Sequence, residues 1–205
     1  MSTTLSKVVL VAGGWLVGIA ALAQPQQGAP AGAVDSSWHP VFAAGLTVGG
    51  DTVAKFQMVD GSTKSLSGGG LVHLYGGIRR QFGLWALQGS AGYQVDDVVA
   101  PNGSARFERF PLEALAQYRA NELVSIGAGL RYVTGARYSA SGAAASTWLP
   151  NNVSLTVSPS LFFEGDYALS EKANLAVRLV SETYKDAWGG SFKGDHIGFY
   201  IKGIF

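Results

Sequence analysis

The strongest constraint on this chain is an alternation of apolar residues with polar or small ones that recurs along most of its length. Residues 195–205 are the clearest example, because Ile197, Phe199 and Ile201 occupy every second position between polar or small residues. A period of two gives a β-strand one apolar and one polar face. After residue 23 the sequence contains no helical heptad and no uninterrupted apolar run of membrane-helix length. We therefore expect strands throughout.

The N-terminal residues have the three parts of a secretory signal peptide. Lys7 supplies the positive charge, residues 8–20 the apolar segment, and residues 21–23 (Ala-Leu-Ala) a cleavage site of the small-x-small type. The alternative is a transmembrane anchor, but the apolar segment is shorter than the roughly 20 residues that a membrane-spanning helix needs. We expect a signal peptide at residues 1–23 that is cleaved on export.

The remaining chain divides into a lead-in and one domain. Residues 24–40 are rich in Pro, Gly, Ala and Ser without periodicity, which predicts a flexible periplasmic segment. Residues 41–205 then form the predicted domain. Removing the signal removes Lys7 and no acid, so the 15 basic and 14 acidic residues of the full chain become balanced. This balance argues against a nucleic-acid partner, and the lack of cysteine excludes disulfides and thiolate metal sites.

The pattern predicts about eight strands, at roughly 41–59, 64–80, 84–98, 105–120, 124–132, 153–169, 174–182 and 195–205. The connections after the second, fourth and sixth strands are short, and the others are similar or longer. An even strand number with this rhythm is typical of an all-β, eight-stranded antiparallel up-and-down transmembrane β-barrel with both ends in the periplasm. Pro111 interrupts the fourth strand and predicts an edge or a bulge there.

A secreted soluble barrel or sandwich is the alternative, because its strands alternate too. In that fold the apolar face would point into the core and the polar face into water, whereas a membrane barrel reverses the two. The signal peptide, the even strand number and the terminal Phe205 together favour the membrane.

The chain resembles the small bacterial outer-membrane barrels, the OmpA-like and OmpW-like domains, over about residues 41–205. The resemblance rests on the Ala-Leu-Ala site, the alternating segments and the last strand, in which Phe199, Ile201 and Phe205 resemble the C-terminal insertion signal of these barrels. Gly203 departs from that signal, since a second large apolar residue is usual there. The resemblance implies a porin-like monomer integral to the Gram-negative outer membrane. Its partners would be lipopolysaccharide or phospholipid and the barrel-assembly machinery, with no cofactor.

Charged residues recur on the polar faces of the predicted strands, which would line a narrow lumen. Because unpaired buried charge is costly, we expect them to form one network. Its predicted members are Arg79, Asp96, Arg109, Glu113, Arg131, Glu164, Arg178, Glu182 and Lys202. Such a network would be a stabilising plug or, alternatively, the filter of a narrow channel for small solutes.

Three other functions find less support. The superfamily includes lipid A-modifying enzymes, and His196 with Asp195 and Ser191 is the best constellation for a Ser nucleophile, but a deacylase-type His-x-Ser pair is missing. No metal-ligand spacing stands out. An adhesin would need large outer loops, and only residues 139–152 approach that size. A lateral route for small apolar molecules would need an apolar outer lumen, whereas the predicted inward faces are mostly polar. We predict a non-enzymatic envelope protein.

Overall fold

The computed structural model describes residues 37–57, 61–142 and 152–205. In this part no helix is long and apolar enough to cross a membrane. The strands are β1 (Trp38–Gly49), β2 (Thr52–Gln57), β3 (Thr63–Ser67), β4 (Leu71–Phe82), β5 (Trp85–Ala100), β6 (Gly103–Arg119), β7 (Val124–Gly142), β8 (Val153–Val157), β9 (Ser160–Ser170), β10 (Ala173–Ser181), β11 (Thr183–Lys185), β12 (Ser191–Lys193) and β13 (His196–Ile204). The predicted signal peptide lies outside the described residues.

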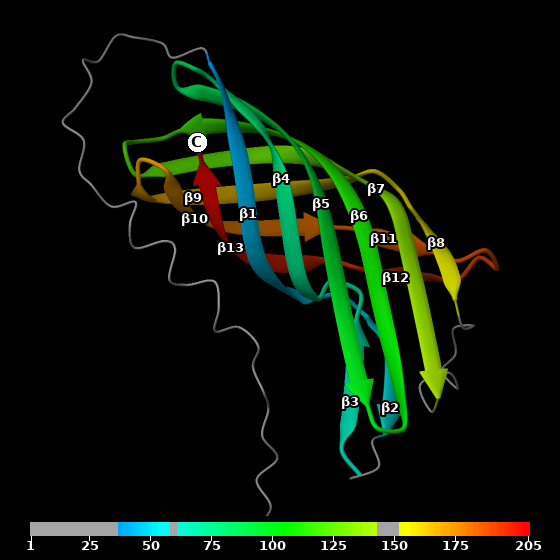
Figure 1. Cartoon of the computed structure of the whole chain (residues 1–205). Coiled ribbons are helices and arrows are strands. Elements are labelled where there is room, and N and C mark those ends of the chain that lie inside the picture. The colour runs from blue at the N-terminus through cyan, green and yellow to red at the C-terminus, as the bar shows by residue number, and fades with distance from the viewer. Residues whose placement is uncertain (1–36, 58–60, 143–151) are drawn as a thin grey trace, which may run out of the picture.

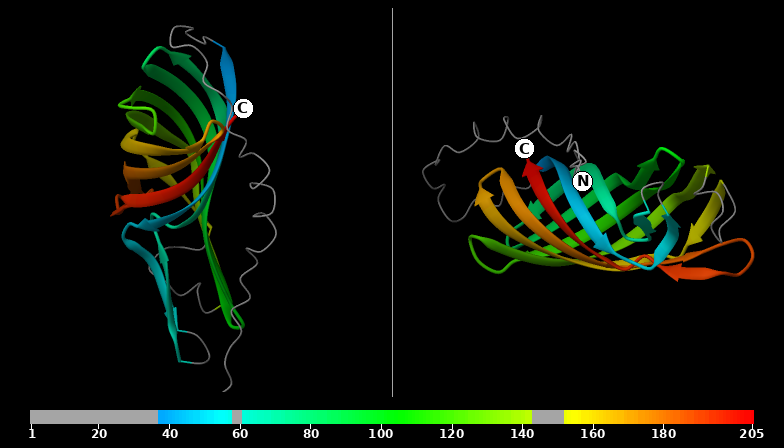
Figure 2. Two further views of the ribbon diagram at one scale, coloured as in Figure 1. Left: turned by 90° about the vertical axis from the view of Figure 1, so that its left-hand side faces the viewer. Right: turned by 90° about the horizontal axis from the view of Figure 1, so that it is seen from below.

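The strands form one closed antiparallel wall. Around the barrel the order is β1, β4, β5, β6, β7, β9, β10 and β13, and β13 pairs back with β1. The other five strands continue barrel strands beyond short interruptions at residues 50–51, 68–70, 158–159, 182 and 194–195. Figures 1 and 2 show the curved strands wrapping into this wall, with the C-terminus beside the start of β1. The predicted eight-stranded up-and-down barrel is confirmed.

The two ends of the barrel differ. At one end, which we call the terminal end, lie Trp38, Phe205 and the short turns at residues 83–84, 120–123 and 171–172. The Phe205 amide donates to the Pro40 carbonyl at 3.0 Å and joins the two described ends of the domain. The opposite, distal end carries the β2–β3 and β11–β12 hairpins and the β5–β6 turn. β1 begins at Trp38, slightly earlier than the predicted start of the domain.

The exterior of the barrel is apolar. Large apolar side chains point outward from all eight barrel strands and are about half exposed; examples are Phe42, Leu46, Ile78, Leu87, Leu112, Leu130, Phe163, Leu179 and Phe199. Charged residues of the same strands, such as Arg131, Glu164 and Arg178, point inward and are buried. A soluble barrel would have the reverse arrangement, so the soluble alternative is wrong.

Paired aromatic residues mark the two borders of this apolar surface on β5 and β6. Trp85 contacts Tyr118, and Tyr93 contacts Phe110, each pair with ring centroids 5.2 Å apart. The two pairs are eight residues apart along each strand. That separation is about 27 Å along a strand. Because the strands of such barrels tilt by about 40° from the barrel axis, it corresponds to about 20 Å along the axis. It is close to the ~25 Å apolar band that outer-membrane barrels present to lipid.

Irregular positions shift the alternation and explain where the predicted faces hold or fail. Pro111 lies at a register shift between β6 and β7, so the predicted bulge is confirmed. Val153 and Leu155 were expected to face outward, but both are buried in the lumen. The interruption at Ser158–Pro159 shifts the alternation by one residue, so that β8 and β9 have opposite phase. A single uninterrupted period therefore assigned β8 to the wrong face.

A pair of matched substitutions tests whether the exterior faces lipid. Ala114 is opposite Gly89, midway between Phe110 and Tyr118, and Ala120 is in the turn after β6; both are exposed alanines. We expect Ala114→Arg to lower the free energy of unfolding in lipid vesicles by about 2–4 kcal/mol, and Ala120→Arg by about 0–1 kcal/mol, because the penalty for arginine falls from the bilayer midplane to the interface. Equal effects in a urea titration would contradict a lipid-facing wall.

Candidate functional site

Ten charged side chains of the described residues are buried in the lumen, five basic and five acidic. Alternation along each strand places them there, since every second residue points inward. They are Arg79, Asp96, Arg109, Glu113, Arg131, Glu164, Asp166, Arg178, Glu182 and Lys202. Seven of them form one continuous series of ion pairs across the middle of the barrel.

Glu113 on β6 is the centre of this series. Its Oε1 accepts from Arg131 Nη1 at 2.9 Å, and its Oε2 accepts from Arg178 Nη1 at 2.7 Å. Arg131 also donates from Nε to Glu182 at 2.8 Å and from Nη2 to Gln94 at 2.5 Å. Charge-assisted bonds of this kind are about twice as strong as neutral ones. One carboxylate thus joins β7 to β10 through the lumen.

The series continues toward the terminal end through Glu164. Arg178 Nε donates to Glu164 Oε2 at 2.8 Å, and Lys202 Nζ bonds Glu164 Oε1 at 2.8 Å. Lys202 also forms an ion pair with Asp166. The Gln117 amide donates to both carboxylates, at 3.2 Å to Glu164 and 3.0 Å to Asp166. Each charge of this part of the series therefore faces an opposite charge.

Aromatic rings hold Arg178 from the remaining sides. Its guanidinium carbon lies 4.8 Å from the ring centroid of Tyr75, 4.4 Å from that of Phe162 and 5.2 Å from that of Tyr200. A guanidinium over an aromatic face gains a cation–π attraction that grows when water is excluded. Arg178 is thus stabilised by both carboxylates and ring faces.

Three of the nine predicted network residues lie outside the series of ion pairs. Arg79 donates to the side chain of Gln117 at 2.5 Å, and Asp96 accepts from the Ser67 amide at 2.9 Å. Arg109 donates to the carbonyls of Gly68 and Gly70. The sequence placed these side chains on the inward face, where, among the described residues, they bond uncharged groups and form no ion pair.

Asp166 is the residue that the sequence analysis omitted from the network. Its Oδ2 accepts from Lys202, Gln117 and Asn174, and with it the buried acids equal the buried bases in number. It follows Glu164 by two positions and so shares its inward face. That spacing was a sufficient signal to include it.

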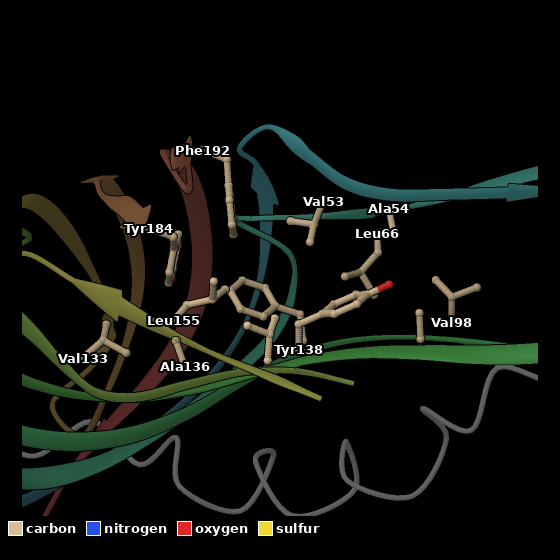
Figure 3. Close-up of a cluster of buried hydrophobic side chains, with 13 residues drawn as sticks. Val53, Ala54, Leu66, Val98, Val133, Ala136, Tyr138, Leu155, Tyr184 and Phe192 are labelled. Atoms are coloured by element: carbon tan, nitrogen blue, oxygen red, sulfur yellow. The ribbon is translucent and has the colours of Figure 1, made fainter. Parts of the chain in front are cut away.

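The lumen changes character toward both ends. At the distal end it is filled by an apolar cluster, which we call the distal apolar cluster (Figure 3). Its buried members are Val53, Ala54, Leu66, Val98, Ala105, Phe107, Val133, Ala136, Tyr138, Val153, Leu155, Tyr184 and Phe192. The expectation of mostly polar inward faces was wrong for this half of the barrel. At the terminal end a polar cavity of about 540 Å³ reaches inward to Arg79 and Asp166.

The structure does not join the residues of the candidate catalytic constellation. His196 is buried, and its Nδ1 pairs with the Gly194 carbonyl at 2.7 Å. Asp195 instead accepts from the Glu182 amide at 2.8 Å and from the Ser181 hydroxyl at 3.2 Å. Within the described ranges, no group of three or more His, Asp or Glu residues is arranged to hold a metal ion. Phe199, Ile201 and Phe205, the predicted insertion signal, point outward.

Removing the central carboxylate tests whether the lumen charges stabilise the barrel. We expect Glu113→Gln to lower the free energy of unfolding by about 3–5 kcal/mol, because it leaves two buried guanidinium groups with too little negative charge. Glu108→Gln, on the same strand, is the control, since Glu108 pairs with a half-exposed Arg106 at 3.5 Å and such pairs contribute about 0–1 kcal/mol. Urea unfolding in vesicles measures both. Equal losses would contradict a stabilising network.

No protein-family model and no curated protein matches this chain. Among solved structures, Ail, the attachment invasion locus protein of Yersinia pestis in complex with the heparin analogue sucrose octasulfate, is similar with a TM-score of 0.52 and 11% identity, over 83% of this chain and 98% of Ail. Neisserial surface protein A gives a TM-score of 0.42 and 10% identity over 82% of this chain and 94% of its own. At these identities the likeness to Ail concerns the fold. The closed antiparallel wall, its apolar exterior and this likeness together identify the chain as a protein with the fold of the small eight-stranded outer-membrane β-barrels.

Proposed function

We propose that this protein is an integral, non-enzymatic outer-membrane barrel whose charge-filled lumen is closed, with a structural role in the envelope. The observation that carries the proposal is the unbroken series of ion pairs from Glu182 to Asp166 across the middle of the barrel. Its side chains are at most 2% exposed. In an eight-stranded barrel the interior is only wide enough for side chains, so a paired network replaces an apolar core.

The distal apolar cluster supports a closed lumen independently of the charges. Phe107 packs against Tyr184 and Phe192, with ring centroids 5.1 and 6.0 Å apart. An ion moving along the lumen would have to lose its hydration among these rings before it met the ionic layer. Two different barriers thus lie in series along one axis.

Location and partners follow from the exterior. The apolar surface between the aromatic pairs suits a bilayer, and lipopolysaccharide or phospholipid would contact it directly. The signal peptide would direct export of the chain. The barrel-assembly machinery would then insert a monomer into the outer membrane, guided by Phe199, Ile201 and Phe205.

A narrow channel for small solutes is the second candidate. The observation that favours it is the polar cavity of about 540 Å³ at the terminal end, which already covers part of the path to Arg79 and Asp166. Conduction would require ion pairs in the middle layer to exchange partners and the distal apolar cluster to part.

Conductance of the refolded mature protein in a planar bilayer separates the two candidates. We expect no discrete openings from the native protein, because the ionic and apolar layers both block the lumen. Folding is checked by the different gel mobility of boiled and unboiled samples. Discrete native openings that change with Glu113→Gln or Arg178→Ala, but not with Glu108→Gln, would instead establish the lumen as a path with the network as its filter.

A further inference from the structure

The β2–β3 hairpin is a separate unit at the distal end. It forms its own two-stranded sheet, and among the described residues no ladder pairing connects it to the barrel wall. Figure 1 shows it (cyan) continuing beyond β1 and β4 toward the distal ends of β5 and β6. Polar contacts to the wall include the Asn102 amide donating to the Gln57 carbonyl at 3.3 Å and the Ser67 amide donating to Asp96. Rotation of the hairpin would therefore break no ladder pairing, although it would break the two bonds between Asp51 and Lys193 of β12, at 2.7 and 2.8 Å.

Glycines form a hinge where the chain enters and leaves the hairpin. Gly49 and Gly50 have φ angles of +129° and +78°, which residues with a side chain rarely adopt, and residues 68–70 are all glycine. The two segments touch, since the Gly68 amide donates to the Asp51 carbonyl at 2.9 Å and the Gly69 amide to the Gly49 carbonyl at 3.2 Å. Glycines on both sides allow the hairpin to rotate as one body.

The underside of the hairpin covers the distal apolar cluster (Figure 3). Val53, Ala54 and Leu66 are buried against aromatic and aliphatic side chains of the wall. With the hairpin removed, the wall would present an apolar bowl that contains Phe107, Tyr138, Tyr184 and Phe192. The hairpin thus fills a site that the barrel wall forms.

Arg109 lies at the floor of this bowl and bonds the hinge. It is fully buried, and in the described part of the chain no acid forms an ion pair with it. Nη1 donates to the Gly68 carbonyl and Nη2 to the Gly70 carbonyl, while Nε has no partner. Its guanidinium lies 4.6 Å from the ring centroid of Phe107. The other mid-lumen cations, Arg131, Arg178 and Lys202, all have carboxylate partners.

We propose that the β2–β3 hairpin is a lid over a binding site for a small amphiphilic anion that enters from the aqueous side. The anionic head would take the guanidinium of Arg109 from the Gly68 and Gly70 carbonyls, because a carboxylate binds guanidinium in a bidentate, charge-assisted geometry. Its apolar tail would replace Val53, Ala54 and Leu66 in the bowl. Releasing the two carbonyls would remove the contacts of Arg109 with the hinge and so favour opening of the lid. Full opening would also break the bonds between Asp51 and Lys193 and the bond from Gln94 to the Gly69 carbonyl.

Decanoate is the probe, with decanol and acetate as comparisons that lack the charge and the tail. Calorimetry uses the full barrel in phosphatidylcholine nanodiscs, with empty nanodiscs subtracted. We expect saturable binding of one decanoate per barrel. Decanol should bind at least about tenfold more weakly than decanoate, since the charge-assisted contact is lost. Acetate should not bind measurably. Absence of decanoate binding, or equal affinity for decanol, would overturn the proposal.

Arg109→Gln tests the head-group contact, and Arg106→Gln is its matched control. Arg106 lies on the same strand, faces outward and donates to the Tyr93 hydroxyl at 2.7 Å. We expect Arg109→Gln to weaken decanoate binding by about tenfold or more and Arg106→Gln to leave it unchanged. Gel mobility of unboiled samples confirms that each variant is folded. Unchanged binding in folded Arg109→Gln would contradict the assignment.

A disulfide staple tests the lid within a single protein. The chain has no cysteine, so a Gln57→Cys/Asn102→Cys variant has a single thiol pair, between the end of β2 and the β5–β6 turn, where the Asn102 side chain reaches the Gln57 carbonyl. We expect the oxidised form to lose decanoate binding and the reduced form to regain it. Comparing redox states of one variant separates lid closure from any folding defect. Full binding by the oxidised form would show that the hairpin is not the lid.

Discussion

Glu113 accepts hydrogen bonds from two guanidinium groups at once, and the arrangement of the barrel depends on this bridge. Glu113 is directly opposite Arg131 in the β6–β7 ladder, and Arg178 is directly opposite Glu164 in the β9–β10 ladder. The 2.7 Å contact between Glu113 and Arg178 then crosses the lumen. A slip by two residues in either ladder would keep each side chain on its face but separate a buried pair. The charges therefore select one register where the apolar exterior would accept several.

Two requirements determine the layers of the lumen: the pairing of buried charges and the packing of apolar side chains. Wherever inward side chains are charged, each needs an opposite charge within reach, and the middle of the barrel meets this condition with a series of four acids and three bases. Toward the distal end the strands carry Phe107, Tyr138 and Tyr184 inward, so closure there depends on apolar packing. An irregularity in β6–β7 and another before β9 lie between these layers, and each lets a strand change phase without leaving the wall.

Period-two alternation was enough to assign the barrel, the outward apolar residues and the inward positions of Glu113, Arg131 and Arg178. It failed for Leu155, because a phase shift at Ser158–Pro159 has no signature in the alternation itself. It also could not predict that Arg109 bonds glycine carbonyls, since that contact depends on how the hinge folds back into the lumen. Alternation determines the face of a residue. Partners depend on height and on chain reversals, which are properties of the closed barrel.

Arg109 connects the apolar and ionic layers. Its Nη1 lies 3.5 Å from the Tyr184 hydroxyl, which donates to Glu182, and Glu182 accepts from Arg131 at 2.8 Å. A continuous polar path thus leads from the glycine hinge to the central bridge at Glu113, although the hinge itself belongs to the distal end. If an anion drew Arg109 away from Gly68 and Gly70, the change at Tyr184 would reach Glu182 through one hydrogen bond. The hinge of the hairpin and the lumen network are therefore parts of one hydrogen-bonded structure that passes through Tyr184, so a change at the hinge would be expected to reach the network along this path.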